Sequence, residues 1–181
     1  MLLNTSLNRG QKLHQGQKLL EVDQEEAPLT ENLRYPVSLL AVLLVGLIAG
    51  LLVGTAMDHH KLRVLDAVAW TSARQSMDGL FSKLMPWWWN TTLLILFFAG
   101  YLNQGRARWL FMSAGVLLLF GIVITVAFEV PMNKNIASWT ASTIPENWGE
   151  IRERWLTFHN VRTVAGVLAF ICALVGVAAR D

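Results

Sequence analysis

The chain has very little cysteine and few charged residues. Its one cysteine is Cys172, so neither an intramolecular disulfide nor a cysteine-based metal motif can form. Charged residues make up 15% of the 181 positions, against about 25% in a typical soluble domain. The 15 Lys and Arg residues are spread along the chain and form no basic cluster, so a nucleic-acid partner is not expected. These shortages point away from an ordinary soluble domain.

Long apolar runs take the place of the missing charge. Hydrophobic residues make up 54% of the sequence, and they are concentrated in four segments close to the roughly 20 residues that a spanning helix needs. The predicted spans are residues 37–57, 87–103, 109–128 and 161–179. The turn between the second and third spans is so short that these two spans are expected to be antiparallel neighbours.

Residues 58–86 have a different pattern. Apolar residues recur at intervals of three and four, and charged side chains such as Asp66 and Arg74 lie between them. That pattern is typical of an amphipathic helix, which is too charged to span and either lies at the membrane interface or folds back over the bundle. We therefore predict an all-α fold: an integral membrane four-helix bundle with an additional amphipathic interfacial helix between spans 1 and 2.

The ends of the chain suggest its placement. Residues 1–35 form a polar N-terminal tail without the pattern of a cleavable signal peptide, and residues 36–181 form the four-span membrane domain. An even number of spans puts both termini on one side, and the Lys and Arg residues near them favour the cytoplasm. The expected location is the cell membrane, as a multi-pass protein of the bacterial inner membrane.

The first span has small residues on one face. Glycines recur at four-residue spacing, at Gly46, Gly50 and Gly54. Such a stripe lets another backbone approach closely in lipid. Besides the lipid bilayer, the expected partners are therefore a second copy of the chain or a larger membrane complex, with plain packing inside the bundle as the alternative.

Polar residues gather at one end of the predicted bundle. The last helix is expected to start before the membrane, with Thr143 and Glu146 as a capping box. On it, Trp148, Trp155, His159 and Arg162 share one face because they are spaced by seven, four and three residues. This face suits either interfacial anchoring or the binding of an anionic group.

Glu129 is the acid next to a spanning core. A carboxylate there is costly unless it is paired, which makes it a candidate site residue, with a structural ion pair to Arg162 or Lys134 as the alternative. Pro131 is expected to end the third span. Asn133 follows in the turn beyond it.

A metal ion has little support in the sequence. The weak candidate ligands are His59, His60, His159 and Glu129. Adjacent residues such as His59 and His60 point about 100° apart on a helix, and no ligand-spacing motif accompanies them. We therefore expect no metal or other cofactor, with those four residues as the ligands if a metal ion is bound.

Two motifs resemble a known family. Val130–Asn135 reads V-P-M-N-K-N and Phe158–Thr163 reads F-H-N-V-R-T, with Trp148 and Trp155 between them. Together with the apolar last span they resemble the anthrone oxygenase-like family of small four-helix membrane proteins. The resemblance implies a neutral residue at position 129, and Glu129 departs from it. Fungal members are linked to the oxidation of anthrones to anthraquinones with molecular oxygen and no obvious cofactor.

The resemblance implies a cofactor-independent oxygenase acting on an apolar aromatic or phenolic substrate through a base-generated enolate. His159 is the expected base with Glu129 as the alternative, and Arg162 stabilises the anion. The predicted catalytic residues are His159, Arg162, Glu129 and Asn133, and the predicted substrate-binding residues are Trp155, Trp148, Asn90 and Asn160. The competing function is non-catalytic: a small subunit or assembly factor of a larger membrane complex.

Overall fold

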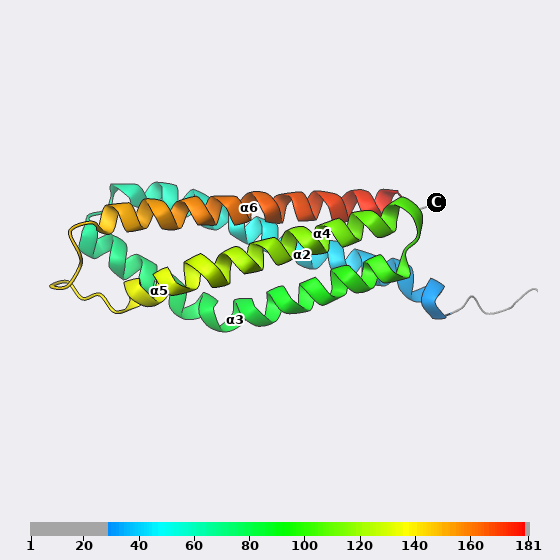
Figure 1. The fold of residues 1–181 in the computed structure, drawn as a ribbon, viewed down its shortest axis with the longest axis horizontal. Helices are drawn as coiled ribbons and strands as arrows, with labels where there is room; N and C mark the ends of the chain where they lie inside the picture. Colours follow the sequence, from blue (N-terminus) through cyan, green and yellow to red (C-terminus); the bar gives the residue numbers. More distant parts are fainter. Residues whose placement is uncertain (1–28, 180–181) are drawn as a thin grey trace, which may run out of the picture. The chain divides into compact units, whose positions relative to one another are not determined.

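The computed structural model describes residues 29–179, and every element in that range is helical. The chain divides between Leu33 and Arg34, and residues 34–179 make up the helical bundle. The elements are α2 (Leu29–Lys61), η1 (Leu62–Val64), α3 (Ala67–Leu102), α4 (Gly105–Ile124), η2 (Thr125–Glu129), α5 (Val130–Ala137) and α6 (Trp148–Ala178) (Figure 1). The all-α fold class is therefore confirmed. Most of the predicted polar tail lies outside the described residues.

Three stretches of helix are long and apolar enough to cross a membrane. They are Thr30–Val64, Gly105–Ala137 and Trp148–Ala178. They contain the first, third and fourth predicted spans, apart from the final residue of the fourth, and they indicate a membrane protein. The second predicted span, residues 87–103, falls almost entirely in α3, which does not meet the same criterion among the described residues. The count of four spans stays a prediction.

The boundary predicted at Pro86 is wrong. Residues 67–86 of the amphipathic segment and the second apolar run are one continuous helix, α3, with Pro86 inside it, while residues 58–64 belong to the end of α2 and to η1. Pro86 has no amide proton to bond the carbonyl of Ser82, so the helix continues with one backbone hydrogen bond fewer. One turn later, Asn90 Nδ2 donates to the carbonyl of Pro86 at 2.6 Å. At the start of α3 the side chain of Asp66 accepts from the amide of Ala69 at 2.8 Å, an ordinary N-cap.

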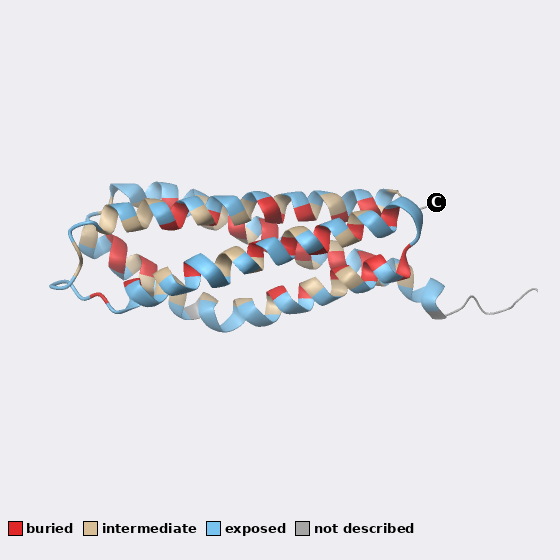
Figure 2. Ribbon diagram, viewed as in Figure 1, coloured by how far each residue is buried: buried red, intermediate tan, exposed pale blue. Residues whose placement is uncertain are grey.

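Close helix contacts form the main apolar core. Buried residues of α2, α3, α4 and α6 line the inner faces of the bundle, and the outer faces are largely exposed (Figure 2). A Cβ on Gly115 would lie 2.8 Å from the ring of Phe97, and one on Gly46 would lie 2.9 Å from the ring of Phe170. Gly46 of the predicted stripe therefore serves packing inside the bundle. Gly50 and Gly54 have no atom within 4 Å of such a Cβ.

A second, smaller core lies at the loop end of the bundle. Trp70, Ile136 and Trp139 are buried there, with Trp148 packed against them. The predicted capping box is wrong, because α6 begins at Trp148. The side chain of Thr143 instead closes a turn by accepting from the amide of Thr140 at 2.8 Å.

The helix that contains the third predicted span does not end at Pro131. It widens into one π-helical turn, η2, and continues as α5 to Ala137. Pro131 has no amide proton, and its ring crowds the carbonyl four residues earlier. The wider turn accommodates this, with the amide of Val130 bonding the carbonyl of Thr125. The prediction that proline stops the helix was wrong because it ignored this local adjustment.

Candidate active site

A cavity of about 500 Å³ lies among α2, α3, the end of α4, η2, α5 and α6. Most of its wall is apolar, with Leu52, Phe81, Met85 and Ile122 among the lining residues. The exposed lining residues come from two places: Ser82, Pro86 and Asn90 on α3, and Val126, Val130, Lys134 and Ala137 on η2 and α5. The cavity therefore opens sideways between these elements. Its size lies within the range of small-molecule sites, about 300–1,000 Å³.

A buried ion pair forms one polar wall of the cavity. Glu129 Oε2 lies 2.7 Å from Arg162 Nη1, and the Glu129 side chain is only 1% exposed. The same Nη1 donates to Thr125 Oγ1 at 3.0 Å. Thr125 and Glu129 are the two ends of the π-helical turn. The turn thus presents both acceptors to one guanidinium.

The hydrogen bonds of His159 fix its tautomer. Its Nε2 lies 3.0 Å from the carbonyl oxygen of Leu52, which only accepts, so Nε2 carries the proton. Its Nδ1 lies 2.8 Å from Arg162 Nη2, which only donates, so Nδ1 is unprotonated. Protonating Nδ1 would lose this bond and place two cations in contact. The geometry therefore disfavours His159 as a base.

One carboxylate oxygen of Glu129 is less engaged than the Nδ1 of His159. Glu129 Oε1 makes no hydrogen bond with any residue in the described part of the chain, and it lies 3.8 Å from His159 Nδ1. A carboxylate with one oxygen anchored and the other unengaged can accept a proton. Among the predicted bases, the geometry thus favours Glu129.

Asn133 joins α3, α5 and α6 at the other polar wall. Its Oδ1 accepts from Trp155 Nε1 at 2.9 Å and from Arg74 Nη2 at 2.8 Å, while its Nδ2 donates to Asp78 Oδ1 at 2.9 Å. The guanidinium of Arg74 also lies over the Trp155 ring, 4.3 Å from its centroid. Burial lowers the pKa of Arg74, while the carboxylates of Asp78 and Glu129 raise it.

The two walls meet at Trp155. The His159 ring stacks on it with centroids 4.9 Å apart, and the His59 ring approaches it at 4.3 Å. His59 is buried, and its Nε2 has no hydrogen-bond partner among the described residues. The structure therefore places His59 next to Trp155 and His159, in the same part of the bundle as Glu129.

Three of the predicted residues lie elsewhere. Trp148 packs in the second core, under Arg152, and does not line the cavity. Asn160 and His60 are exposed and are also absent from the cavity wall. Asn90 does line the cavity, at its opening. Residues 29–179 contain no group of three or more His, Cys, Asp or Glu side chains arranged to hold a metal ion.

The family model described as "Anthrone oxygenase" matches residues 77–172, more than half of the chain. The chain belongs to the anthrone oxygenase family. No curated protein and no solved structure matches it. The matched segment of this family member includes Glu129, Asn133, Trp155, His159 and Arg162.

Sequence reasoning missed several site residues of this anthrone oxygenase family member. Arg74 and Asp78 belong to the segment that was predicted to be an amphipathic interfacial helix, and neither was predicted to be a site residue. Trp89 lines the cavity with Arg162 5.9 Å from its ring centroid, although the tryptophan cluster in which it lies predicted only interfacial anchoring. The four-residue spacing of Arg74 and Asp78 was the available signal, because it pairs opposite charges on one helix face.

Proposed function

We propose that the protein oxidises a flat, apolar aromatic ketone that has an acidic C–H bond, with molecular oxygen as the oxidant. The observation that carries this proposal is Glu129, a buried carboxylate in the wall of an apolar cavity, with one oxygen on Arg162 and the other without a hydrogen bond to any described residue. Membership of the anthrone oxygenase family supports the same reaction class. An anthrone is a substrate of this kind.

The proposed reaction begins with proton transfer. Glu129 removes one proton from the ring carbon that lies opposite the ketone, and the ketone oxygen takes up the resulting negative charge. Arg162, which donates to three different side chains at the cavity wall, stabilises this enolate electrostatically. The low dielectric of a closed apolar site strengthens that interaction.

Oxygen then supplies the oxidising equivalents. The electron-rich carbon reacts with O2 to form a C–O bond, and the proton held by Glu129 returns to give a hydroperoxide. Loss of water from the hydroperoxide yields the second ring ketone. One O2 is consumed and one water is released, so a metal or organic cofactor is not part of the proposal.

Oxygen uptake with a hydroxylated anthrone tests this proposal. Glu129→Gln keeps the size of the side chain but removes the base, and the rate of uptake should fall by about 100-fold or more. His159→Gln is the matched comparison, because the amide can still donate to Leu52 and accept from Arg162. The rate of oxygen uptake by His159→Gln should fall by no more than about tenfold.

Comparing Glu129→Gln with His159→Gln distinguishes which of the two residues is the base. An equal, large loss in both would assign the base to His159, and full uptake by Glu129→Gln would overturn base catalysis by Glu129. Arg162→Met should also lose most of the uptake, and full activity in that variant would remove the proposed anion stabiliser.

We also propose an association surface on α2 as the basis of the non-catalytic alternative. Gly50 and Gly54 have no atom within 4 Å of an added Cβ, so this part of the stripe is open for a second helix. Gly50→Leu should turn an oligomer or complex into a single copy, as measured by the mass of the detergent-purified protein. A single copy in the unmodified protein would exclude this association.

A further inference from the structure

Arg74 is a buried cation for which the proposed proton transfer has no use. It is 5% exposed and lines the cavity. Its hydrogen bonds all come from Nη2, to Asn133 at 2.8 Å and to Asp78 at 3.5 Å. Nε is buried and has no partner among the described residues. A guanidinium has five N–H donors, so most of the donor capacity of Arg74 is not engaged by the protein.

The ion pair of Arg74 is weak. Asp78 Oδ1 lies at the long distance of 3.5 Å from Arg74, while it accepts from Asn133 at 2.9 Å. By contrast, the pair between Glu129 and Arg162 is formed at 2.7 Å. Arg74 is therefore held in place mainly by Asn133 and by the Trp155 ring. Its charge is less fully balanced than that of Arg162.

The cavity wall as a whole also carries an unbalanced positive charge. Its cationic residues are Arg74, Lys134 and Arg162, and its anionic residues are Asp78 and Glu129. One positive charge is left over. In a largely apolar cavity this excess favours a ligand with one negative charge.

Arg74 is the better of the two candidate partners for that charge. Lys134 lies at the exposed opening, where solvent and salt screen its interactions. Arg74 is buried, and its planar guanidinium suits a carboxylate or phenolate. It also lies ahead of residues 77–172, so the family match does not account for it.

We infer that Arg74 forms a second binding site in the cavity, which holds an anionic oxygen, a carboxylate or an ionised phenol, on the aromatic ligand. The inference rests on the proposed function, because it takes the ligand to be a flat polycyclic aromatic molecule. It adds that the ligand is a monoanion, bound by Arg74 through its acidic group and facing Glu129 with its reacting carbon.

Binding of two unreactive ligands tests the inference without turnover. The probes are anthraquinone and anthraquinone-2-carboxylate, with quenching of tryptophan fluorescence as the readout in detergent micelles. The full-length protein should bind the carboxylate about 10- to 100-fold more tightly than the neutral ligand. Arg74→Met should bind the two ligands equally, while its affinity for neutral anthraquinone shows that the cavity is intact.

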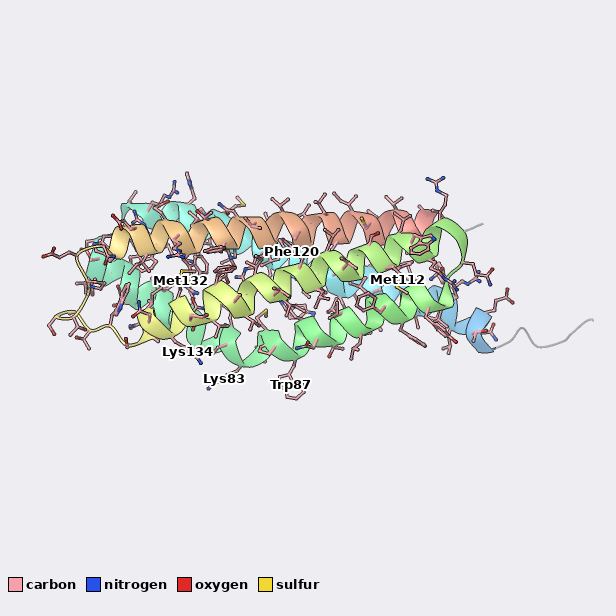
Figure 3. All side chains as sticks on the ribbon, viewed as in Figure 1. Lys83, Trp87, Met112, Phe120, Met132 and Lys134 are labelled. Atoms are coloured by element: carbon pink, nitrogen blue, oxygen red, sulfur yellow. The ribbon has the colours of Figure 1, made fainter. Side chains whose placement is uncertain are left out.

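Lys83→Met is the matched control. It removes the same charge from the same helix, but Lys83 is exposed, points away from the bundle and is not part of the cavity wall (Figure 3). The preference for the carboxylate should persist in this variant. If Arg74→Met does not fold, Arg74→Lys replaces it, and a loss of at least about fivefold in the preference is expected because the planar fork is lost.

The outcomes distinguish the inference from the proposed function. Equal binding of both probes by the unmodified protein, no binding of either probe, or loss of the preference in Lys134→Met but not in the Arg74 variant overturns the inference. A preference that depends on Arg74, in a protein that shows no oxygen uptake with any anthrone, supports the inference and rejects the oxygenase reaction instead.

Discussion

The buried pair of Glu129 and Arg162 should show strong energetic coupling. The side chains are 1% and 13% exposed, and their closest atoms lie 2.7 Å apart. Removing one partner of such a pair leaves an uncompensated buried charge, which costs about 3–5 kcal/mol. We therefore expect Glu129→Gln and Arg162→Met each to lower the free energy of unfolding by about that amount.

The double variant should lower the free energy of unfolding by far less than the sum of the two single variants. With both charges gone, the main remaining loss is the hydrogen bond that Arg162 donates to His159 Nδ1 at 2.8 Å. An unpaired buried acceptor of this kind costs about 1–3 kcal/mol. The coupling between the two sites should thus reach about 3 kcal/mol or more.

Unfolding in detergent micelles, followed by tryptophan fluorescence, measures this coupling. The control is Asp58 and Lys61, which lie 3.4 Å apart with side chains 58% and 72% exposed. An exposed pair at this spacing on a helix should show a coupling of about 0.5 kcal/mol or less. Additive losses at Glu129 and Arg162 would refute the claim that the two residues stabilise each other as a buried ion pair.

Three further outcomes are expected in the same unfolding assay. Asn133→Leu should destabilise by about 2–4 kcal/mol, because three polar partners, of which Arg74 and Trp155 are buried, lose their bond at once; a change below about 1 kcal/mol would contradict this. Gly115→Ala should cost about 1–3 kcal/mol because its Cβ would meet Phe97, whereas Gly50→Ala should be neutral. His59→Phe should be neutral or stabilising by about 1 kcal/mol, since it removes a buried nitrogen without a partner; a large loss would reveal a hydrogen bond to water.

Much of one wall of the site could be predicted from the sequence. Trp155, His159 and Arg162 lie on one helix, so their spacing alone places them on one face. Glu129 was identifiable because an acid beside an apolar run needs a partner. These arguments depend on periodicity within one segment and on the cost of a buried charge, which are properties of the sequence itself.

The opposite wall depends on tertiary contacts that periodicity does not contain. Arg74 has the spacing of an ordinary charged helix face, and only the packing of α3 over Asn133 and Trp155 buries it. The proposal of Glu129 instead of His159 as the base likewise depends on the carbonyl of Leu52, which lies 107 positions away from His159 in the chain. No local pattern reports such a contact.

The length of α6 has a consequence for how substrates and protons reach the site. Its 31 residues extend for about 46 Å, which exceeds the roughly 30 Å hydrocarbon core of a bilayer. The apolar part from Val161 onward accounts for about 27 Å of this. The charged turns around Glu150–Arg154 therefore belong in water, which places His159 and Arg162 at the boundary between the two solvents. An apolar ligand can then enter the site laterally from the lipid, while the proton is exchanged with water on the other side.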